Sequence, residues 1–207
     1  MLRKAGVTYA DVTGYQFDRG DVTGRGLANW YAQALGQNFS EPTGKPYEVE
    51  IVVAEVGAQP DGDQIYRISW DGSVSDEPGF VAFGGQADQV AAALKERFSD
   101  GMSLTEALGA ALAALAAPAA ASGAAAASNG SQPELTAANL EVAILDRARA
   151  HRTFRRLAGP RLEELITESR AAETAEAAEA EPPEQPEQPS SDDPPTGPSS
   201  AGDGTPR

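Results

Sequence analysis

The 207-residue chain contains no cysteine and only one histidine, and both scarcities exclude whole classes of site. Without cysteine it forms neither disulfides nor thiolate metal sites. Zinc sites usually take two or more Cys or His ligands, which this chain cannot supply. A Ser-His-Asp triad would have to use His151, which lies in an arginine-rich turn and is expected to be exposed there. We therefore predict no metal, no cofactor and no catalytic residue.

Long apolar runs and an excess of positive charge are also missing. No stretch is apolar enough to cross a bilayer, and the first twelve residues lack the continuous apolar segment of a secretory signal. Acidic residues outnumber basic ones by 31 to 16, which gives a formal charge of −15. Because phosphate backbones repel so acidic a chain, nucleic acid is not expected as its main partner. Together these features predict a cytoplasmic protein that binds neither membrane nor nucleic acid.

The composition changes near the end of the chain. From residue 171 onward the sequence is rich in Ala, Glu, Pro and Ser, and it offers almost no large apolar side chain to bury. Burial cannot then offset the entropy lost on ordering. We predict a folded domain over residues 1–168 and a disordered acidic tail over 169–207, with some helix possible in AAETAEAAEAE. The Ala- and Ser-rich stretch 116–131 is expected to be a flexible loop within the domain.

Alternating apolar residues predict antiparallel strands. Residues 47–56 and 65–70 form the first two, and Asp71-Gly72 supplies a tight turn into the segment that leads to a third strand at 80–83. Residues 140–145 and 153–157 predict a final pair of strands around a basic turn. These segments indicate a meander followed by a hairpin.

Helical spacing appears in four further segments. Apolar stripes predict helices at 27–39, 87–98 and 104–115, the last opened by a Ser103/Glu106 capping box, and Gly159-Pro160 opens a short helix at 162–166. Residues 7–12 fit a strand by β-branching and a helix by apolar spacing, so the pattern leaves both open. The order of elements predicts an α+β fold in which helices cover antiparallel sheet on both sides.

The tetrapeptide DVTG occurs at 11–14 and again at 21–24, and the tripeptide Arg19-Gly20-Asp21 overlaps the second copy. This region has four possible interpretations: a repeat, a phosphate loop, an adhesion tripeptide or a helix start. The residues after the two copies differ, the G-x-x-x-x-G-K-[ST] spacing is absent, and no predicted strand precedes the glycines. Arg-Gly-Asp is common by chance, and the chain shows no sign of export. A helix start is favoured, with Asp21 or Thr23 accepting hydrogen bonds from the free N–H groups.

Arginine residues are concentrated between residues 147 and 161. They could bind an anionic ligand, or they could belong to a solvated hairpin. Single-strand binders need several aromatic rings among their basic residues, and here only Phe154 supplies one. The solvated hairpin is therefore favoured. The arginines concerned are Arg147, Arg149, Arg152, Arg155, Arg156 and Arg161.

Several consecutive segments resemble the α subunit of the actinobacterial core proteasome, over nearly all of residues 2–166. They are GYQFDRGDVTGRGLANWYAQALG, KPYEVEIVVAEV, IYRISWDGSVSDEPGFVAFGG, QVAAALKERF, SLTEAL, LEVAILDR and TFRRLAG. The resemblance implies an αββα sandwich of the N-terminal-nucleophile hydrolase type, an antiparallel β-sandwich flanked by helices on both faces. It also implies that residues 2–17 are helical and that residues 21–26 turn between two packed helices.

The resemblance further implies a non-catalytic role. Seven copies would form a homoheptameric α ring that templates the β rings and provides the substrate entrance for intracellular protein degradation. The β subunits would carry the N-terminal threonine nucleophile, and a ring-shaped AAA ATPase would act as activator. In the family the first helical layer faces the β ring, so we expect subunit-interface residues at its second helix, namely Asp21, Thr23, Arg25, Asn29 and Tyr31.

Members of this family carry a gate segment, an outer helix and their first strands before the point that matches Leu2. The resemblance therefore implies a subunit without these parts, to which no gate or activator-docking residue is assigned. We expect such a chain to assemble poorly, because unpaired strand edges favour aggregation. A version extended upstream is expected to form rings with its β partner. The alternatives are a standalone N-terminal-nucleophile-like hydrolase, which would need a nucleophile at a processed terminus, and an anionic-ligand binding module built on the arginine hairpin.

Overall fold

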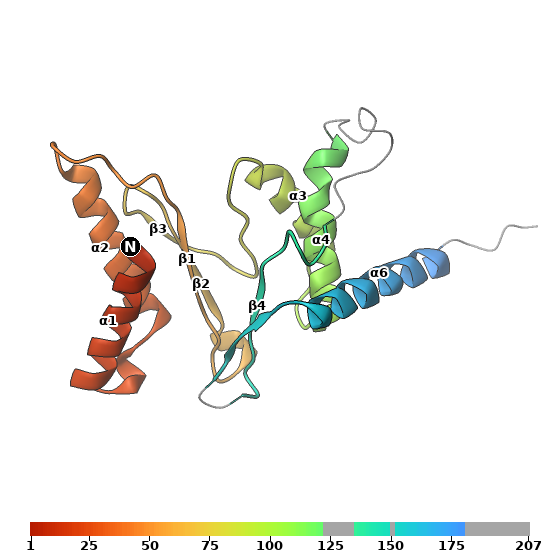
Figure 1. Cartoon of the computed structure of the whole chain (residues 1–207), viewed down its shortest axis with the longest axis horizontal. Coiled ribbons are helices and arrows are strands. Elements are labelled where there is room, and N and C mark those ends of the chain that lie inside the picture. The colour runs from red at the N-terminus through yellow and green to blue at the C-terminus, as the bar shows by residue number, and fades with distance from the viewer. Residues whose placement is uncertain (122–134, 150–151, 181–207) are drawn as a thin grey trace, which may run out of the picture.

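The computed structural model describes residues 1–121, 135–149 and 152–180. Helices α1 and α2 lie on one side of the molecule, a three-stranded sheet follows, then a two-stranded sheet, and α4 and α6 form the other side with α3 packed on α4 (Figure 1). In chain order the elements are α1 (Leu2–Gln16), η1 (Arg19–Asp21), α2 (Gly24–Ser40), β1 (Ile51–Glu55), η2 (Pro60–Gly62), β2 (Gln64–Ile68), β3 (Val74–Asp76), α3 (Ala87–Arg97), α4 (Leu104–Ala121), β4 (Val142–Leu145), β5 (Phe154–Leu157) and α6 (Pro160–Ala180).

Helix α1 forms where local pattern left strand and helix open. Gly6 is buried against α2, where an added Cβ would overlap the Tyr31 ring. The Tyr31 hydroxyl donates a hydrogen bond to the Leu2 carbonyl at 3.2 Å, and the Tyr9 ring stacks on Trp30 with centroids 5.4 Å apart. These contacts with α2 outweigh the weak helix propensity of glycine. The helix implied by the family resemblance is confirmed.

The first sheet has the order β1-β2-β3, and all its pairs are antiparallel, with Val53 opposite Tyr66 and Tyr66 opposite Asp76. Helix α2 covers one face of this sheet. The core between them consists of Ala28, Tyr31, Leu35, Val53, Tyr66 and Ile68.

The predicted third strand at 80–83 is wrong, since β3 comes directly after the Asp71-Gly72 turn. Asp71 accepts hydrogen bonds from the Ser73 N–H and hydroxyl, and Gly72 has a φ of 88° that suits glycine, so the chain reverses at once. Phe80 instead packs its ring against Phe98 at 5.4 Å. Sequence pattern signalled the turn but placed the strand too late.

The second sheet pairs β4 with β5, as predicted, with Val142 opposite Leu157. Its covered face packs against α4 and α6 in a second core, whose buried members are Leu108, Leu112, Leu157, Leu162, Leu165 and Ile166. The Ser103/Glu106 capping box is also confirmed, with the Ser103 N–H donating to Glu106 Oε2 at 2.7 Å.

Both C-terminal helices are longer than predicted. Helix α4 continues through residues 116–121, which were expected to be loop, because alanine favours helix and Ala114 is buried. The remainder of 116–131 lies outside the described residues from position 122 onward. Helix α6 spans 21 residues where five were predicted, and it crosses the proposed boundary at 168/169. The division into domain and tail stays a prediction.

Arg147 joins the two halves of the molecule. Its guanidinium donates to both oxygens of Asp63, at 3.0 and 2.8 Å, and to the Gly57 carbonyl at 2.5 Å. Gly57 and Asp63 flank η2, the loop between β1 and β2, while Arg147 directly follows Asp146 at the end of β4. The β4–β5 hairpin is therefore held at the η2 end of the first sheet.

Candidate subunit-contact surface at the start of helix α2

Thr23 begins helix α2 as its N-cap. The Gly26 N–H donates to Thr23 Oγ1 at 3.0 Å, and the Gly24 N–H donates to Glu55 Oε2 at 2.7 Å. Two of the free N–H groups of the helix are thus satisfied, one of them by a carboxylate that also favours the positive end of the helix dipole. The predicted helix start is confirmed for Thr23. Since Glu55 belongs to β1, this contact also fixes α2 on the sheet.

Asp21 serves the preceding turn. Its carboxylate accepts from the Asp18 N–H at 3.1 Å, while Asp18 accepts from the Gly20 N–H at 2.8 Å. This reciprocal pair closes η1, which contains the Arg-Gly-Asp sequence. The tripeptide therefore forms a compact turn between two helices, close to where the resemblance placed one.

The five predicted interface residues separate into two groups. Asp21, Thr23, Arg25 and Asn29 are exposed, and Arg25 and Asn29 lie one helical turn apart on α2. Tyr31 is 7% exposed and belongs to the first core, where burial raises the pKa of its phenol. Any contribution from Tyr31 to a contact surface would come from packing beneath it.

Arg25 leans toward the sheet. Hydrogen bonding to Tyr66 raises the pKa of the Arg25 guanidinium, and the nearby Asp76 carboxylate acts in the same direction. The side chain thus lies close to β2 and β3 while the residue remains exposed.

Exposed apolar residues on α1 border this surface, and sequence reasoning did not select them. Val7, Val12, Tyr15 and Phe17 are 57%, 46%, 91% and 75% exposed. Val12 and Tyr15 lie one helical turn apart, whereas Val7 lies five residues before Val12, so a helical stripe alone would not have identified these three residues together. Clustered exposed apolar residues of this kind mark contact surfaces.

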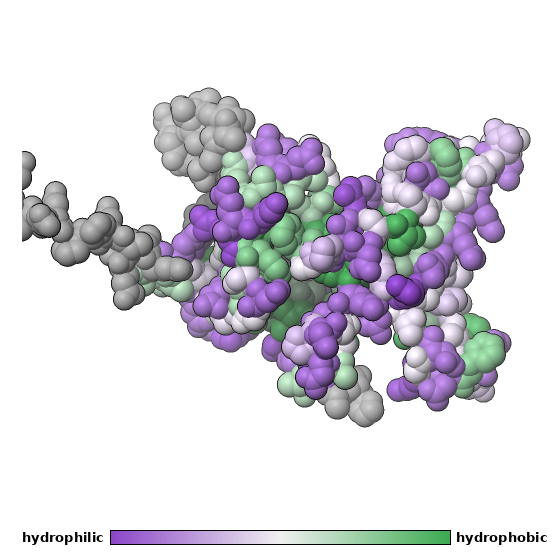
Figure 2. All heavy atoms as spheres, turned by 180° about the vertical axis from the view of Figure 1, so that it is seen from behind, coloured by the Kyte–Doolittle hydropathy of each residue, from purple (hydrophilic) through white to green (hydrophobic). Residues whose placement is uncertain are grey.

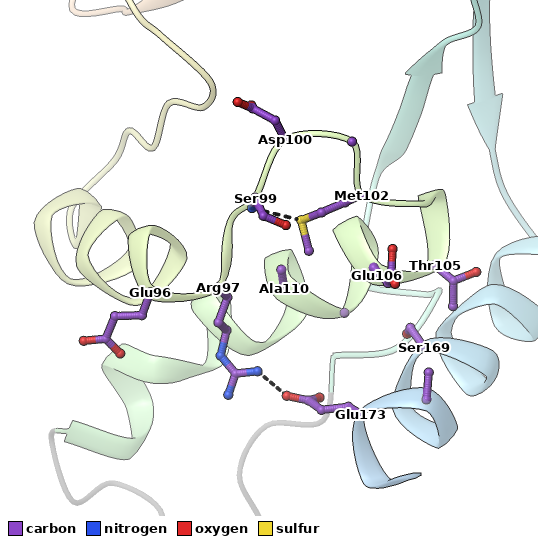
Figure 3. Close-up of a pocket in the computed structure, with 13 residues that line it drawn as sticks. Glu96, Arg97, Ser99, Asp100, Met102, Thr105, Glu106, Ala110, Ser169 and Glu173 are labelled. Atoms are coloured by element: carbon purple, nitrogen blue, oxygen red, sulfur yellow. Dashed lines mark hydrogen bonds and ion pairs between the residues drawn. The ribbon is translucent and has the colours of Figure 1, made fainter. Parts of the chain in front are cut away.

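A cavity of about 640 Å³ lies between the α3–α4 loop and α6 (Figure 3). Arg97 and Glu173 form an ion pair across it, and the Ser99 N–H contacts Met102 Sδ at 3.4 Å. The buried Ser169 hydroxyl donates to the Ile166 carbonyl at 2.9 Å, so no base activates it as a nucleophile. The cavity contains no arrangement that would perform acyl transfer.

The predicted arginine cluster is largely neutralised by neighbouring acids. Besides the Arg147–Asp63 contact, there are three pairs: Arg155–Asp146 at 4.0 Å, Arg156–Glu141 at 3.7 Å and Arg161–Glu164 at 3.1 Å. Arg149 and Arg152 are exposed at the tip of the hairpin. His151 lies outside the described residues. This pairing supports a solvated hairpin over an anion-binding pocket.

In the part of the chain that the structure describes, no three acidic or histidine side chains converge as a metal site would require. Over the same residues, no helix has the length and apolar character needed to span a membrane.

The family model described as "Proteasome subunit" matches residues 10–130. The chain belongs to the proteasome subunit family.

Curated relatives from several organisms carry the name "Proteasome subunit alpha". The protein of Thermomonospora curvata is 58% identical over 167 residues, which cover 81% of this chain and 67% of the relative. The protein of Kineococcus radiotolerans is 58% identical over 166 residues (80% and 68%), and that of Streptosporangium roseum is 55% identical over 170 residues (82% and 61%). The chain thus spans about two thirds of the length of these relatives, and the resemblance to the actinobacterial α subunit is confirmed.

Proposed function

We propose that the chain is a non-catalytic α-ring subunit of a core proteasome, which templates β-ring assembly and forms the substrate entrance for intracellular protein degradation. The observation that carries this proposal is the identity of 53–58% over about 80% of the chain with actinobacterial proteins named "Proteasome subunit alpha". In this proposal the chain forms a homoheptameric ring in the cytoplasm, contacts β subunits and receives a ring-shaped AAA ATPase activator.

The exposed faces of the two sheets support an αββα sandwich. Val53, Tyr66 and Ile68 are buried, whereas the alternate residues Val52 and Ile65 are only partly buried on the face away from α2. On the second sheet, Leu145 and Phe154 lie opposite one another and are 37% and 62% exposed. Hydrophobic residues are visible in the middle of the molecule, and a further hydrophobic patch lies at its α1–α2 end (Figure 2). In the proposed sandwich these two apolar faces form the inner layer.

The surface at the start of α2 is the proposed contact with the β ring. Asp21, Thr23, Arg25 and Asn29 present its polar groups, and Tyr31 supports it from below. The exposed apolar residues at α1 border these groups and supply area that polar residues alone would not.

A peptidase assay separates this proposal from a standalone N-terminal-nucleophile-like hydrolase. The purified chain, free of β subunits, is expected to leave fluorogenic peptides intact, because acyl transfer needs a nucleophile paired with a base. Peptide hydrolysis that co-purifies with the chain and survives removal of every β subunit would contradict the proposal. The positive control is the same preparation after addition of an active β-type subunit.

A further inference from the structure

Three exposed aromatic rings gather where α2 ends. Phe39, Tyr47 and Trp70 are 43%, 40% and 46% exposed, and the rings of Phe39 and Trp70 meet edge to face with centroids 4.9 Å apart. A cavity of about 490 Å³ beside them is lined by Pro46, Glu48, Val49, Glu50 and Trp70. We call this set of residues the aromatic surface. Such aromatic clusters are typical of the centres of protein–protein interfaces.

The aromatic surface is held in place by its surroundings. The Tyr47 N–H donates to Asn38 Oδ1 at 2.8 Å, which ties the segment after α2 back to that helix. Gly72, two residues after Trp70, packs so closely on α2 that an added Cβ would lie 2.6 Å from the Ala32 carbonyl oxygen. A side chain that is already positioned loses less entropy on binding.

The rim of the aromatic surface is acidic. Glu41, Glu48 and Asp71 are exposed and lie close in sequence to its aromatic rings. Two positive charges are paired here, Lys45 with Glu48 at 3.4 Å in a highly exposed contact and Arg67 with Glu50 at 2.6 Å. Exposed pairs such as the first contribute little. The surface therefore favours a partner that presents positive charge.

The same chain carries a matching basic surface at its opposite end. Arg149 and Arg152 lie at the tip of the β4–β5 hairpin, where the Arg152 N–H donates to the Arg149 carbonyl. Arg147 anchors this hairpin at the η2 end of the first sheet, beside Asp63. We call Arg149 and Arg152 the basic tip.

Helix α2 separates the two surfaces. Its first N–H groups are held by Glu55 at the η2 end of β1, and its last turn brings Phe39 to Trp70 beyond the other end of β2. A helix of 17 residues is about 25 Å long, so the basic tip does not reach the aromatic surface of its own chain. It can reach that of a second copy. Two different surfaces at opposite ends of a subunit make the head-to-tail contacts from which rings are built.

We propose that neighbouring copies of this chain contact one another head to tail, with the basic tip of one copy seated on the aromatic surface of the next. This inference rests on the proposed function, because it assigns residues to the contact between α-ring neighbours. Charge complementarity sets the orientation, and Trp70 is the central apolar anchor.

Cysteine cross-linking tests the contact, since the chain has no cysteine and each variant introduces one thiol per copy. Glu48→Cys and Arg152→Cys chains with different tags are co-expressed with a proteasome β-type subunit and oxidised. The expected product is a disulfide-linked pair that contains one copy of each variant. Linkage between two copies of the same variant would overturn the proposed contact. Linkage of either variant to a cysteine introduced on the β-type subunit would also overturn it.

Charge reversal gives a second readout. Arg149→Glu/Arg152→Glu is expected to weaken self-association by about tenfold or more, and Glu41→Arg/Glu48→Arg to do the same, because each places like charges together. Mixing the two reversed chains should restore contacts between unlike chains, which are scored as mixed pairs because a seven-membered ring cannot alternate two chain types throughout. Lys95→Glu on α3 is the matched control that should change nothing. Unchanged association of the reversed chains would overturn the contact and leave the proposed function intact. Failure of the unsubstituted chain to associate with any β-type subunit would overturn both.

Discussion

Gly6 is the residue at which α1 and α2 come closest. The Tyr31 ring occupies the space where a Cβ would lie, so a larger side chain would push the helices apart or displace the ring. Glycine costs a helix stability, and here that cost is offset by the Tyr31 packing and by the Tyr31–Leu2 hydrogen bond. The glycine at position 6 is therefore explained by the contact between α1 and α2 and not by the helix propensity of α1 alone.

We expect Gly6→Ala to destabilise the chain by about 1–3 kcal/mol, because it overfills a close-packed site. The matched control is Gly109→Ala on α4, where the nearest atom to an added Cβ is 3.7 Å away. That change is expected to be neutral or to stabilise by up to about 1 kcal/mol through helix propensity. Urea unfolding of both variants measures the difference, and equal effects of the two substitutions would contradict the packing argument.

The Arg147–Asp63 contact predicts a dependence of stability on pH. Hydrogen bonding to Arg147 is the largest cause that lowers the pKa of the Asp63 carboxyl in the folded chain. A group with a lowered folded pKa stabilises the fold above its unfolded pKa, about 3.9 for aspartate, and that stabilisation is lost as the pH falls through the folded value. Asp63→Asn should therefore cost stability near neutral pH and progressively less in acid.

Thermal unfolding across the acid range measures this change for the Asp63→Asn variant. Asp61→Asn is the control, since it removes a nearby charge and leaves the hydrogen bonds between Arg147 and Asp63 in place. A stability loss in Asp63→Asn that stays constant from neutral pH to about pH 3 would contradict the assigned cause.

Among the elements, those with local signals were predictable. The starts of α2 and α4 follow from N-cap residues, and β4 and β5 follow from alternation, so each is specified within its own segment. Helix α1 could not be decided locally, because Gly6 is acceptable only once Tyr31 packs on it. The position of β3 was missed because the hydrogen bonds from Ser73 to Asp71 close the turn within a few residues, so the strand begins directly after it.

The contact surface shows the same limit. Thr23 was found through its cap, but the exposure of Val7 and Val12 depends on which side of α1 meets α2. Tyr31 was selected as an interface residue although the fold buries it. Sequence alone therefore proposed this segment as a contact surface, which stays a prediction, and could not sort its buried side chains from its exposed ones.

The N-cap of α2 is expected to contribute measurably to the stability of the chain. We expect Thr23→Ala to destabilise the chain by about 1 kcal/mol, because the Gly26 N–H loses its acceptor, while Thr23→Ser retains most of the stability. Differential scanning calorimetry of the three proteins gives the comparison. Equal melting temperatures for Thr23→Ala and the parent chain would show that Glu55 alone satisfies the start of the helix.

The whole molecule has two separate hydrophobic cores, and each lies between helices and one of the two sheets. One core joins α2 to the first sheet, and the other joins α4 and α6 to the second, so the helices lie outside and the sheets between them (Figure 1). The apolar residues on the opposite face of each sheet, Val52 and Ile65 on one and Leu145 and Phe154 on the other, fit the inner layer of the proposed sandwich. This layering and the family membership both favour a structural part in a larger assembly.

Native mass spectrometry of the chain co-expressed with a proteasome β-type subunit tests whether this chain is a non-catalytic α-ring subunit. One complex that contains both chains is expected, with seven copies of this chain in each ring, in a lower yield than a longer α-type chain would give because unpaired strand edges favour aggregation. Its peptidase activity should disappear when the β nucleophile is replaced, and the chain described here should contribute none. A chain that stays monomeric beside assembled β subunits, or a complex that retains activity without the β nucleophile, would contradict the account.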